Sequence, residues 1–204
     1  MVYSINIITN EKGILFTDIK GKVHKEKFVT IENTKGYSSY LLSNTGKIYS
    51  FYLKRQMNTS KNSKGYKKIY FYNPDKNDSR DVKYLHRLVA EKFLEKTKRD
   101  IELKRNTLHF IDWNRKNVTY CNLMWLNNKE MMALRNFHMK LNKTKSIYDK
   151  EIHKYLDYFL TSENRYTMKE IIKIFYYDFE YNMIEDLEEI KSFLKKRRKE
   201  LKNK

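Results

Sequence analysis

The chain has 204 residues, of which 40% are hydrophobic and 15% aromatic, and its formal net charge is +18. This length and hydrophobic content allow a packed domain with a small second module and exclude wholesale disorder. Cys121 is the only cysteine, which excludes an intramolecular disulfide and a multi-cysteine zinc site.

The positive charge is concentrated in the first three quarters of the chain. Residues 149–204 hold 13 basic and 12 acidic residues, whereas residues 1–148 hold 30 and 13, a net charge of +17. An AT-rich genome enriches Lys, Asn, Ile and Tyr whatever the function, but it does not explain this distribution. Because Lys and Arg bound to phosphates release counterions, the distribution predicts a polyanionic partner for residues 1–148.

The first third of the chain is predicted to be β-rich. Short β-branched or aromatic runs separated by turn-like segments mark the strands, and residues 1–34 form a β-rich N-terminal extension. The segment 35–53 predicts a hairpin around Ser43–Gly46. The expected strands are YSINII (3–8), GILFTDI (13–19), KFVTIEN (27–33) and the strand after the turn in NSKGYKKIYFYN (62–73), which precedes a polar loop at 73–81.

After residue 81 the spacing of the apolar residues changes to that of a helix. Residues 83–96 carry Leu85, Leu88, Val89 and Phe93 on one stripe, which predicts a helix. LHFID (108–112) predicts a strand or irregular structure. From Asn127 the sequence resembles a capped helix with an apolar stripe, formed by Met131, Leu134 and His138 or Met139. Residues 35–142 would form one domain, followed by a linker at 143–148.

Residues 149–204 are predicted to form a small helical, helix-turn-helix-like module. Three helices are expected: 149–160; 167–175, where Thr167 and Glu170 have capping-box spacing; and a last one with Ile184, Leu187, Ile190 and Leu194. The fold class is therefore α+β, with a β-rich N-terminal module, a central domain and a helical C-terminal module.

The central domain contains a motif frame that resembles a known family. Ile111-Asp112-x-Asn114, then Asn117, then Asn122-Leu123-x-Trp125 keep the spacing of HNH homing endonucleases of phage and intron type. HRLVAEKFL (86–94) resembles the helix that precedes this pattern in the family. The stretches at 36–51 and 62–72 resemble the β-module that is often fused to it. The resemblance implies a ββα-metal core that binds DNA.

The resemblance also implies a site that departs from the family pattern. His109 and Asn122 would be the metal ligands, and Mg²⁺ is expected only if the site still functions. The general-base position holds Phe110, which cannot accept a proton, and the loss of a general base costs about 10²–10⁴-fold in rate. If the alignment slips by one residue, His109 is itself the weak candidate for the catalytic base. Trp113 replaces a glycine whose backbone geometry a bulky side chain resists.

Asp112, Asn114, Asn117 and Trp125 are expected to support the structure of the motif. Tyrosines alternate with basic residues at 47–72, an arrangement that can follow a nucleic-acid backbone, although a half-buried sheet with a solvated lysine face gives the same pattern. The candidate DNA-binding residues are Lys47, Lys54, Arg55, Lys64, Lys67, Lys68, Arg87, Arg115 and Lys116.

The C-terminal module has two interpretations. Its last helix begins with Glu185, Asp186, Glu188 and Glu189, which would repel phosphates. Either Lys195–Lys199 contact the DNA backbone, or the helices bind a protein partner.

Three functions remain open from the sequence. The first is a double-stranded-DNA-binding protein with an inactive or crippled nuclease site, which acts as a regulator or inhibitor in a phage or mobile element. The second is an active Mg²⁺-dependent nicking endonuclease. The third is a scaffold that binds a host or viral protein. No apolar run of 18 residues and no signal-peptide core are present, so no membrane partner and an intracellular location, in the host cytoplasm or nucleoid, are expected.

Overall fold

The structure, a computed structural model, describes residues 15–17, 22–31, 40–72, 80–161, 166–181 and 186–203. The strand predicted at 3–8, most of the loop at 73–81 and residues 182–185 lie outside this part. The architecture is mixed α+β, as predicted, with seven α-helices in the described residues. The chain divides into two compact units, Met1–Glu95 with Asp112–Met124 (unit 1) and Lys96–Ile111 with Trp125–Lys204 (unit 2). The domain ranges inferred from sequence are continuous and remain predictions.

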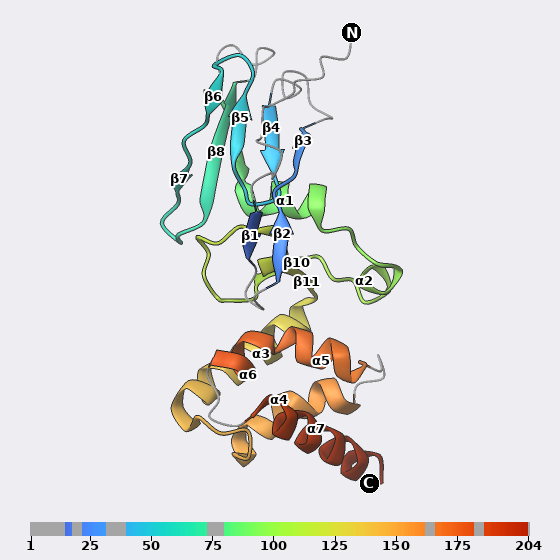
Figure 1. The fold of residues 1–204 in the computed structure, drawn as a ribbon. Helices are drawn as coiled ribbons and strands as arrows, with labels where there is room; N and C mark the ends of the chain where they lie inside the picture. The colour runs from blue at the N-terminus through green and yellow to red at the C-terminus, as the bar shows by residue number, and fades with distance from the viewer. Residues whose placement is uncertain are drawn as a thin grey trace. The chain divides into compact units, whose positions relative to one another are not determined.

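Unit 1 contains a four-stranded antiparallel sheet that includes the predicted hairpin (Figure 1). Its strands are β3 (Phe28–Thr30), β4 (Tyr40–Ser43), β5 (Ile48–Ser50) and β6 (Arg55–Gln56), and a separate pair is formed by β1 (Leu15–Thr17) and β2 (Val23–Lys25). The β4–β5 turn needs Gly46 for two reasons. Its φ is +85°, and a Cβ at this position would collide with Cγ2 of Val118.

A second sheet in unit 1 joins β7 (Ser60–Lys61), β8 (Lys67–Tyr72) and β9 (Arg80–Tyr84). Ile69 and Phe71 of β8 are fully buried, and alternation places Lys68 and Tyr70 on the opposite face. Helix α1 (Leu85–Phe93) follows β9 directly, two residues later than the predicted start, and its Val89 is fully buried. The predicted strand and helix are confirmed here, whereas β9 was not predicted.

The motif lies between two short paired strands, β10 (Thr107–Phe110) and β11 (Leu123–Leu126). A 3-10 turn, η3 (Tyr120–Asn122), precedes β11. The segment 108–112, predicted as strand or irregular structure, is strand in β10 as far as Phe110 and a turn at 111–112. The chain passes between the two units within this segment, because Asp112–Met124 belongs to unit 1 and its flanks belong to unit 2.

Unit 2 is mainly helical. Its helices are α2 (Lys98–Glu102), α3 (Asn128–Thr144), α4 (Lys150–Thr161), α5 (Met168–Ile174), α6 (Tyr176–Tyr181) and α7 (Leu187–Lys202). Helix α4 packs against α3 and α7, and fully buried Phe137, Phe159 and Phe175 are part of this core. The capping boxes of Asn127 with Glu130 and of Thr167 with Glu170 are both formed.

Three details of unit 2 differ from prediction. Helices α2 and α6 were not expected. The buried stripe of α3 includes Leu134, as predicted, but Phe137 and Leu141 complete it, whereas Met139 is 50% exposed. The segment predicted as a linker also contains Ile147, which is fully buried.

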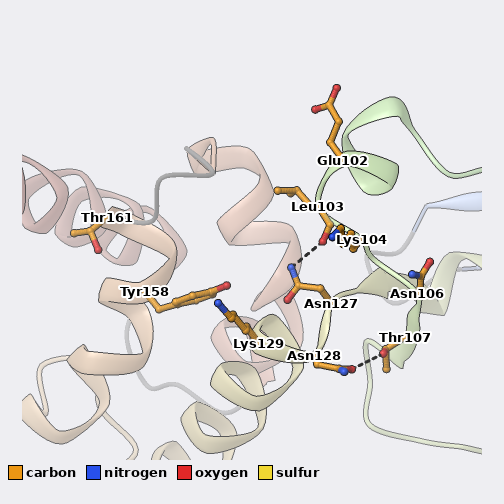
Figure 2. A pocket seen from close by; sticks show the side chains of 10 residues that line it. All are labelled: Glu102, Leu103, Lys104, Asn106, Thr107, Asn127, Asn128, Lys129, Tyr158 and Thr161. Carbon is orange, nitrogen blue, oxygen red and sulfur yellow. Dashed lines mark hydrogen bonds between the residues drawn. The ribbon is translucent and has the colours of Figure 1, made fainter.

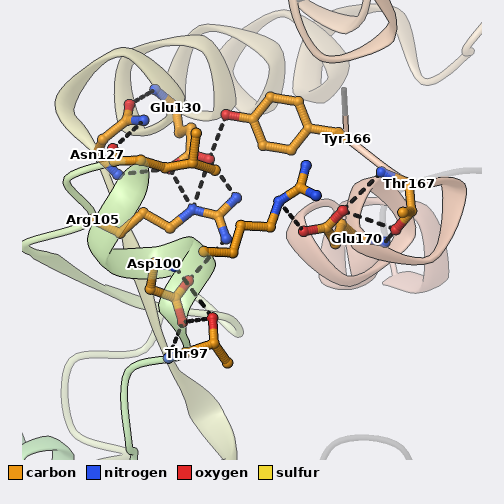
Figure 3. A network of polar contacts seen from close by, with 10 residues as sticks. Thr97, Asp100, Arg105, Asn127, Glu130, Tyr166, Thr167 and Glu170 are labelled. Carbon is orange, nitrogen blue, oxygen red and sulfur yellow. Dashed lines mark hydrogen bonds and ion pairs between the residues drawn. The ribbon is translucent and has the colours of Figure 1, made fainter. Parts of the chain in front are cut away.

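A buried ionic network fixes the start of α3 (Figure 3). Arg105 donates from Nε and Nη2 to Glu130 at 2.9 and 2.6 Å and from Nη1 to Asp100 at 2.9 Å. The Tyr166 hydroxyl donates to Glu130 at 2.6 Å. Burial and Glu130 raise the pKa of Tyr166, so the phenol stays protonated and donates. Each buried charge therefore has several hydrogen-bonding partners. Such partners are needed because a buried ion without them is strongly destabilising.

The last helix uses part of its basic run inside unit 2. Arg197 makes a two-bond contact with Asp157 at 3.0 and 2.8 Å, and Arg198 donates to the Tyr166 carbonyl at 2.5 Å. Lys195, Lys196 and Lys199 are exposed. None of the helices in the described part is long and apolar enough to cross a membrane.

Candidate nucleic-acid interface

The Asp112 carboxylate organises the loop of the motif. One oxygen accepts bonds from the Asn114 backbone N–H and the Asn122 amide, both at 2.8 Å, and the other accepts from the Asn117 amide at 2.8 Å. Asn114 in turn accepts a bond from the Lys116 backbone at 3.0 Å. These short polar side chains close successive turns, so the spacing of the frame has a structural role in this chain.

Trp113 adopts the backbone conformation that glycine would favour. Its φ is +57°, in the left-handed region, despite its large side chain. A non-glycine residue in this region costs about 1–2 kcal/mol. The hydrogen bonds accepted by the Asp112 and Asn114 side chains lie on either side of Trp113. The loop therefore keeps a left-handed turn at this position without a glycine.

Asn122 is buried inside this loop. Its side-chain oxygen accepts from the Asp112 backbone N–H at 3.0 Å, and its amide nitrogen donates to Asp112 and to the Asn117 carbonyl, both at 2.8 Å. The residue is 1% exposed. Both ends of the amide are thus engaged in holding the loop closed.

His109 and Phe110 are also buried, at 5% exposure each. Burial, with a smaller contribution from the charge of His138, lowers the pKa of His109 to about 3. The imidazole is therefore neutral at physiological pH. A neutral imidazole can bind a metal or accept a proton, but this one is shielded from solvent water.

These residues do not fit an open divalent-metal site. Mg²⁺ prefers several oxygen ligands and retains some of its water. Asn122 is enclosed by its own hydrogen bonds, and His109 is only 5% exposed. Among the described residues, no three His, Cys, Asp or Glu side chains gather in a way that could hold a metal.

Arg115 connects the motif loop to the β7–β8 turn within unit 1. Its Nη1 donates to the Lys64 carbonyl at 2.7 Å, and its guanidinium lies over the Tyr66 ring, 4.8 Å from the centroid. A guanidinium has five N–H donors, so this contact leaves others for a phosphate. The structure thus brings Lys64 and Arg115 together. The sequence predicted both as DNA-binding residues but did not predict that they are neighbours.

An aromatic cluster continues from this point. The Tyr66 ring lies 5.0 Å from His86 and 6.2 Å from Tyr84, measured between centroids. Burial, reinforced by the Arg87 charge, lowers the pKa of His86 to about 4. His86 is therefore a neutral, buried ring beneath the tyrosines, whereas Tyr84 is 40% exposed.

The outer face of the β8–β9 pair extends this surface. Lys68 pairs with Tyr84 and Tyr70 with Val82, so the four side chains share one face. Lys68 lies 5.2 Å from the Tyr70 ring centroid. Basic side chains interleaved with exposed rings suit a nucleic-acid backbone and its bases. We call this surface the basic–aromatic face; it comprises Lys64, Tyr66, Lys68, Tyr70, Tyr84 and Arg115.

The other predicted DNA-binding residues are in varied positions. Lys54, Arg55, Arg87 and Lys116 are exposed. Lys47 forms an ion pair with buried Glu26 at 2.9 Å. Its positive charge is therefore already paired within the protein. Lys67 is half-buried, and burial together with the Lys61 charge lowers its pKa.

Tyr84 is the member of this face that sequence reasoning missed. It was assigned to the start of the predicted helix, but it ends β9 and lies opposite Lys68. The available signal was the alternation in Arg80-Asp81-Val82-Lys83-Tyr84, which has the period of a strand rather than a helix.

Comparison with known proteins gives one structural similarity. No family model matches the sequence, and no curated protein matches it. The fold is similar to that of the HNH homing endonuclease I-HmuI, in a solved structure that concerns DNA binding and cleavage by that enzyme, with 21% identity and a TM-score of 0.43. The match covers 63% of this chain and 66% of that one, so it spans just under two thirds of the length of that endonuclease.

Proposed function

We propose that this protein binds double-stranded DNA, that it descends from HNH homing endonucleases, and that its nuclease site is inactive. In this proposal it acts as a regulator or inhibitor in a phage or mobile element. The observation that carries the DNA-binding part is the basic–aromatic face, where Arg115 of the motif loop stacks on Tyr66 beside Lys64. The net charge of +17 in residues 1–148 supports the same partner.

Three observations support the loss of cleavage. The position of the general base in the family pattern holds Phe110, which cannot accept a proton. The neighbouring His109 is neutral and only 5% exposed. Asn122, the second expected ligand, uses both ends of its amide inside the loop. In this proposal the motif is retained as a scaffold for the DNA-binding loop.

The DNA-binding part is tested by measuring affinity for a labelled duplex over a range of salt concentrations. The logarithm of the affinity should fall linearly with the logarithm of the salt concentration, by about 0.9 for each phosphate contact. The triple variant Lys64→Glu, Lys68→Glu and Arg115→Glu should bind much more weakly. The matched control carries the same charge change at exposed lysines outside the face, as Lys25→Glu, Lys27→Glu and Lys92→Glu.

Undetectable duplex binding by the natural protein at low salt would remove DNA as the partner. The loss of cleavage is tested separately with supercoiled plasmid and Mg²⁺ or Mn²⁺. We expect no nicking. Nicking that disappears in both His109→Ala and Asn122→Ala would instead assign the protein as a working nickase.

A further inference from the structure

Helix α3 presents a long solvent-facing stripe in unit 2. Its core side is formed by Leu134, Phe137 and Leu141, all fully buried. The opposite side is exposed at Lys129, Met132, Arg135, Met139, Asn142 and Lys143. These positions recur at steps of three and four, so they form one continuous stripe. A 17-residue helix is about 25 Å long, and the stripe follows nearly all of it.

The stripe, which we call the α3 face, has no negative charge. Glu130 is the only acidic residue of α3, all of whose residues the structure describes, and it is buried against Arg105. Lys140 lies off the stripe and pairs with Glu151 of α4 at 2.5 Å. The α3 face therefore combines three cations with an amide and two methionines, of which Met132 is 66% exposed.

The first turn of α3 also borders a pocket of about 650 Å³ (Figure 2). Lys104 and Lys129 line it, together with the amides of Asn106 and Asn128. Its shape is held by two hydrogen bonds, from Thr107 to Asn128 at 3.0 Å and from the Asn127 amide to the Leu103 carbonyl at 3.2 Å. The one carboxylate in the lining, that of Glu102, points away from the other labelled side chains in Figure 2.

We propose that the α3 face and this pocket form a second nucleic-acid-binding surface, whose partner is duplex DNA. In this arrangement the α3 face lies along a groove of the duplex. Lys104 and Lys129 bind a backbone phosphate next to the first turn of α3. The identity of the partner rests on the proposed function. The surface itself consists of residues of unit 2, so it can be tested independently of the basic–aromatic face, whose residues belong to unit 1.

The chemistry of the α3 face favours a duplex over other partners. The major groove of B-DNA admits one α-helix, and Arg and Asn side chains bond to base edges, while apolar groups contact thymine methyls. The outward side chains Arg135, Asn142, Met132 and Met139 include each of these types. An acidic protein would be bound by the cations alone. The amide and the methionines between the cations therefore favour DNA over an acidic protein as the partner.

A charge-reversal experiment tests the inference on the full chain. The variant Lys129→Glu, Arg135→Glu and Lys143→Glu should lose at least about tenfold in duplex affinity near 0.1 M salt relative to its control. Its salt slope should be smaller in magnitude by about 2, because the phosphate contacts of Lys129 and Lys143 are removed. The matched control is Lys154→Glu, Lys169→Glu and Lys173→Glu, exposed lysines of α4 and α5 in the same unit.

A second measurement needs no substitution. Oxidation of Met132 and Met139 by peroxide, followed by mass spectrometry, should slow when saturating duplex covers the α3 face. Met57 of unit 1, which is half-buried and outside the α3 face, serves as the internal reference.

The outcomes separate the two proposals. Equal losses in the α3 variant and its control, with unchanged methionine oxidation, would overturn the α3 surface and leave the basic–aromatic face untouched. Tighter binding of polyglutamate than of DNA to the α3 face would assign it to an acidic protein. A natural protein that binds no DNA would remove the proposed function, whatever the α3 variant does.

Discussion

The Arg105 guanidinium and the Glu130 carboxylate form a buried ion pair that joins the loop before β10 to the start of α3. Glu130 is fully buried and also closes the capping box with Asn127. One carboxylate therefore neutralises a buried cation, caps a helix and accepts the Tyr166 hydroxyl (Figure 3). Removal of one member leaves the others buried without compensation.

We therefore expect Glu130→Ala to destabilise the protein by about 3–5 kcal/mol, the usual cost of breaking a buried ion pair from one side. Tyr166→Phe removes one hydrogen bond and should cost about 1–2 kcal/mol. Denaturant unfolding followed by circular dichroism measures both. The control Glu188→Ala, which removes an exposed carboxylate paired with Lys191, should change stability by less than about 0.5 kcal/mol. Similar losses in all three variants would contradict this account.

Replacing the stacked arginine of the motif loop separates charge from geometry. Arg115→Lys keeps the charge but loses the planar stack on Tyr66 and the aligned bond to the Lys64 carbonyl. We expect Arg115→Ala to weaken duplex binding and to reduce the magnitude of the salt slope by about 1. Arg115→Lys should keep the slope and lose only part of the affinity. Fluorescence anisotropy at four salt concentrations distinguishes them, and an Arg115→Lys variant that binds as tightly as the natural protein would show that the stack has no role.

Restoring the histidine of the family pattern should not restore cleavage. Phe110→His places a polar ring where a phenyl group is 5% exposed, so it should destabilise the fold by about 1–3 kcal/mol. Asn122 would still be engaged inside the loop. Plasmid nicking with Mg²⁺ should remain at background. Nicking gained by this single change would mean that the remainder of the site is competent and that our account of Asn122 is wrong.

The buried histidine predicts a dependence of stability on pH. The folded pKa of His109, about 3, lies below the usual value of 6.5, so the unfolded chain binds more protons between these values. Stability should therefore fall as the pH decreases from about 6.5 toward 3. Between pH 7 and pH 4.5 the loss of stability caused by His109 is roughly 2–3 kcal/mol. His109→Gln should reduce this fall, and His153→Gln, a half-buried histidine, serves as the control.

Two glycines with nearly equal φ provide a matched test of the β4–β5 turn. Gly46 and Gly65 have φ values of +85° and +82°. A Cβ on Gly65 meets nothing within 4 Å, whereas one on Gly46 collides with Val118. Gly65→Ala should cost about 1 kcal/mol from backbone strain alone. Gly46→Ala should cost at least about 1–3 kcal/mol more, as overpacking does. Val118→Ala in the Gly46→Ala background should recover part of the difference; equal costs for the two single variants would refute the role assigned to Val118.

Local interactions were the part of the fold that the sequence predicted best. The capping boxes at Asn127 and Thr167 involve residues three positions apart, so their pattern is visible in the chain. The β4–β5 hairpin depends on a turn of adjacent residues around Gly46. These elements form from contacts within one or two turns of chain, which is the range over which propensity and spacing are informative.

The missed elements depend on distant partners. Strand β9 is defined by its pairing with β8, and α2 and α6 are only five and six residues long. Short elements of this kind gain stability from packing rather than from propensity. Glu130 is a similar case, because a carboxylate near a helix start suggests a solvated cap, while its partner Arg105 is 25 residues away.

The candidate site was only partly predictable for the same reason. Spacing identified Asp112, Asn114, Asn117 and Asn122 as one frame, and the structure connects them by hydrogen bonds. Spacing alone does not tell whether an asparagine faces outward to a ligand or inward to its own loop. That difference is set by the three-dimensional path of the loop, in which Trp113 takes a left-handed conformation.

The path of the chain also limits how this gene can be rearranged. The polypeptide passes between the two compact units at residues 95–96, 111–112 and 124–125. A fragment ending at residue 95 lacks Asp112–Met124 of unit 1, and one beginning at residue 125 lacks Lys96–Ile111 of unit 2. A single recombination event therefore cannot transfer one whole unit without also carrying a segment of the other. A frameshift or truncation within residues 96–124 leaves both units incomplete.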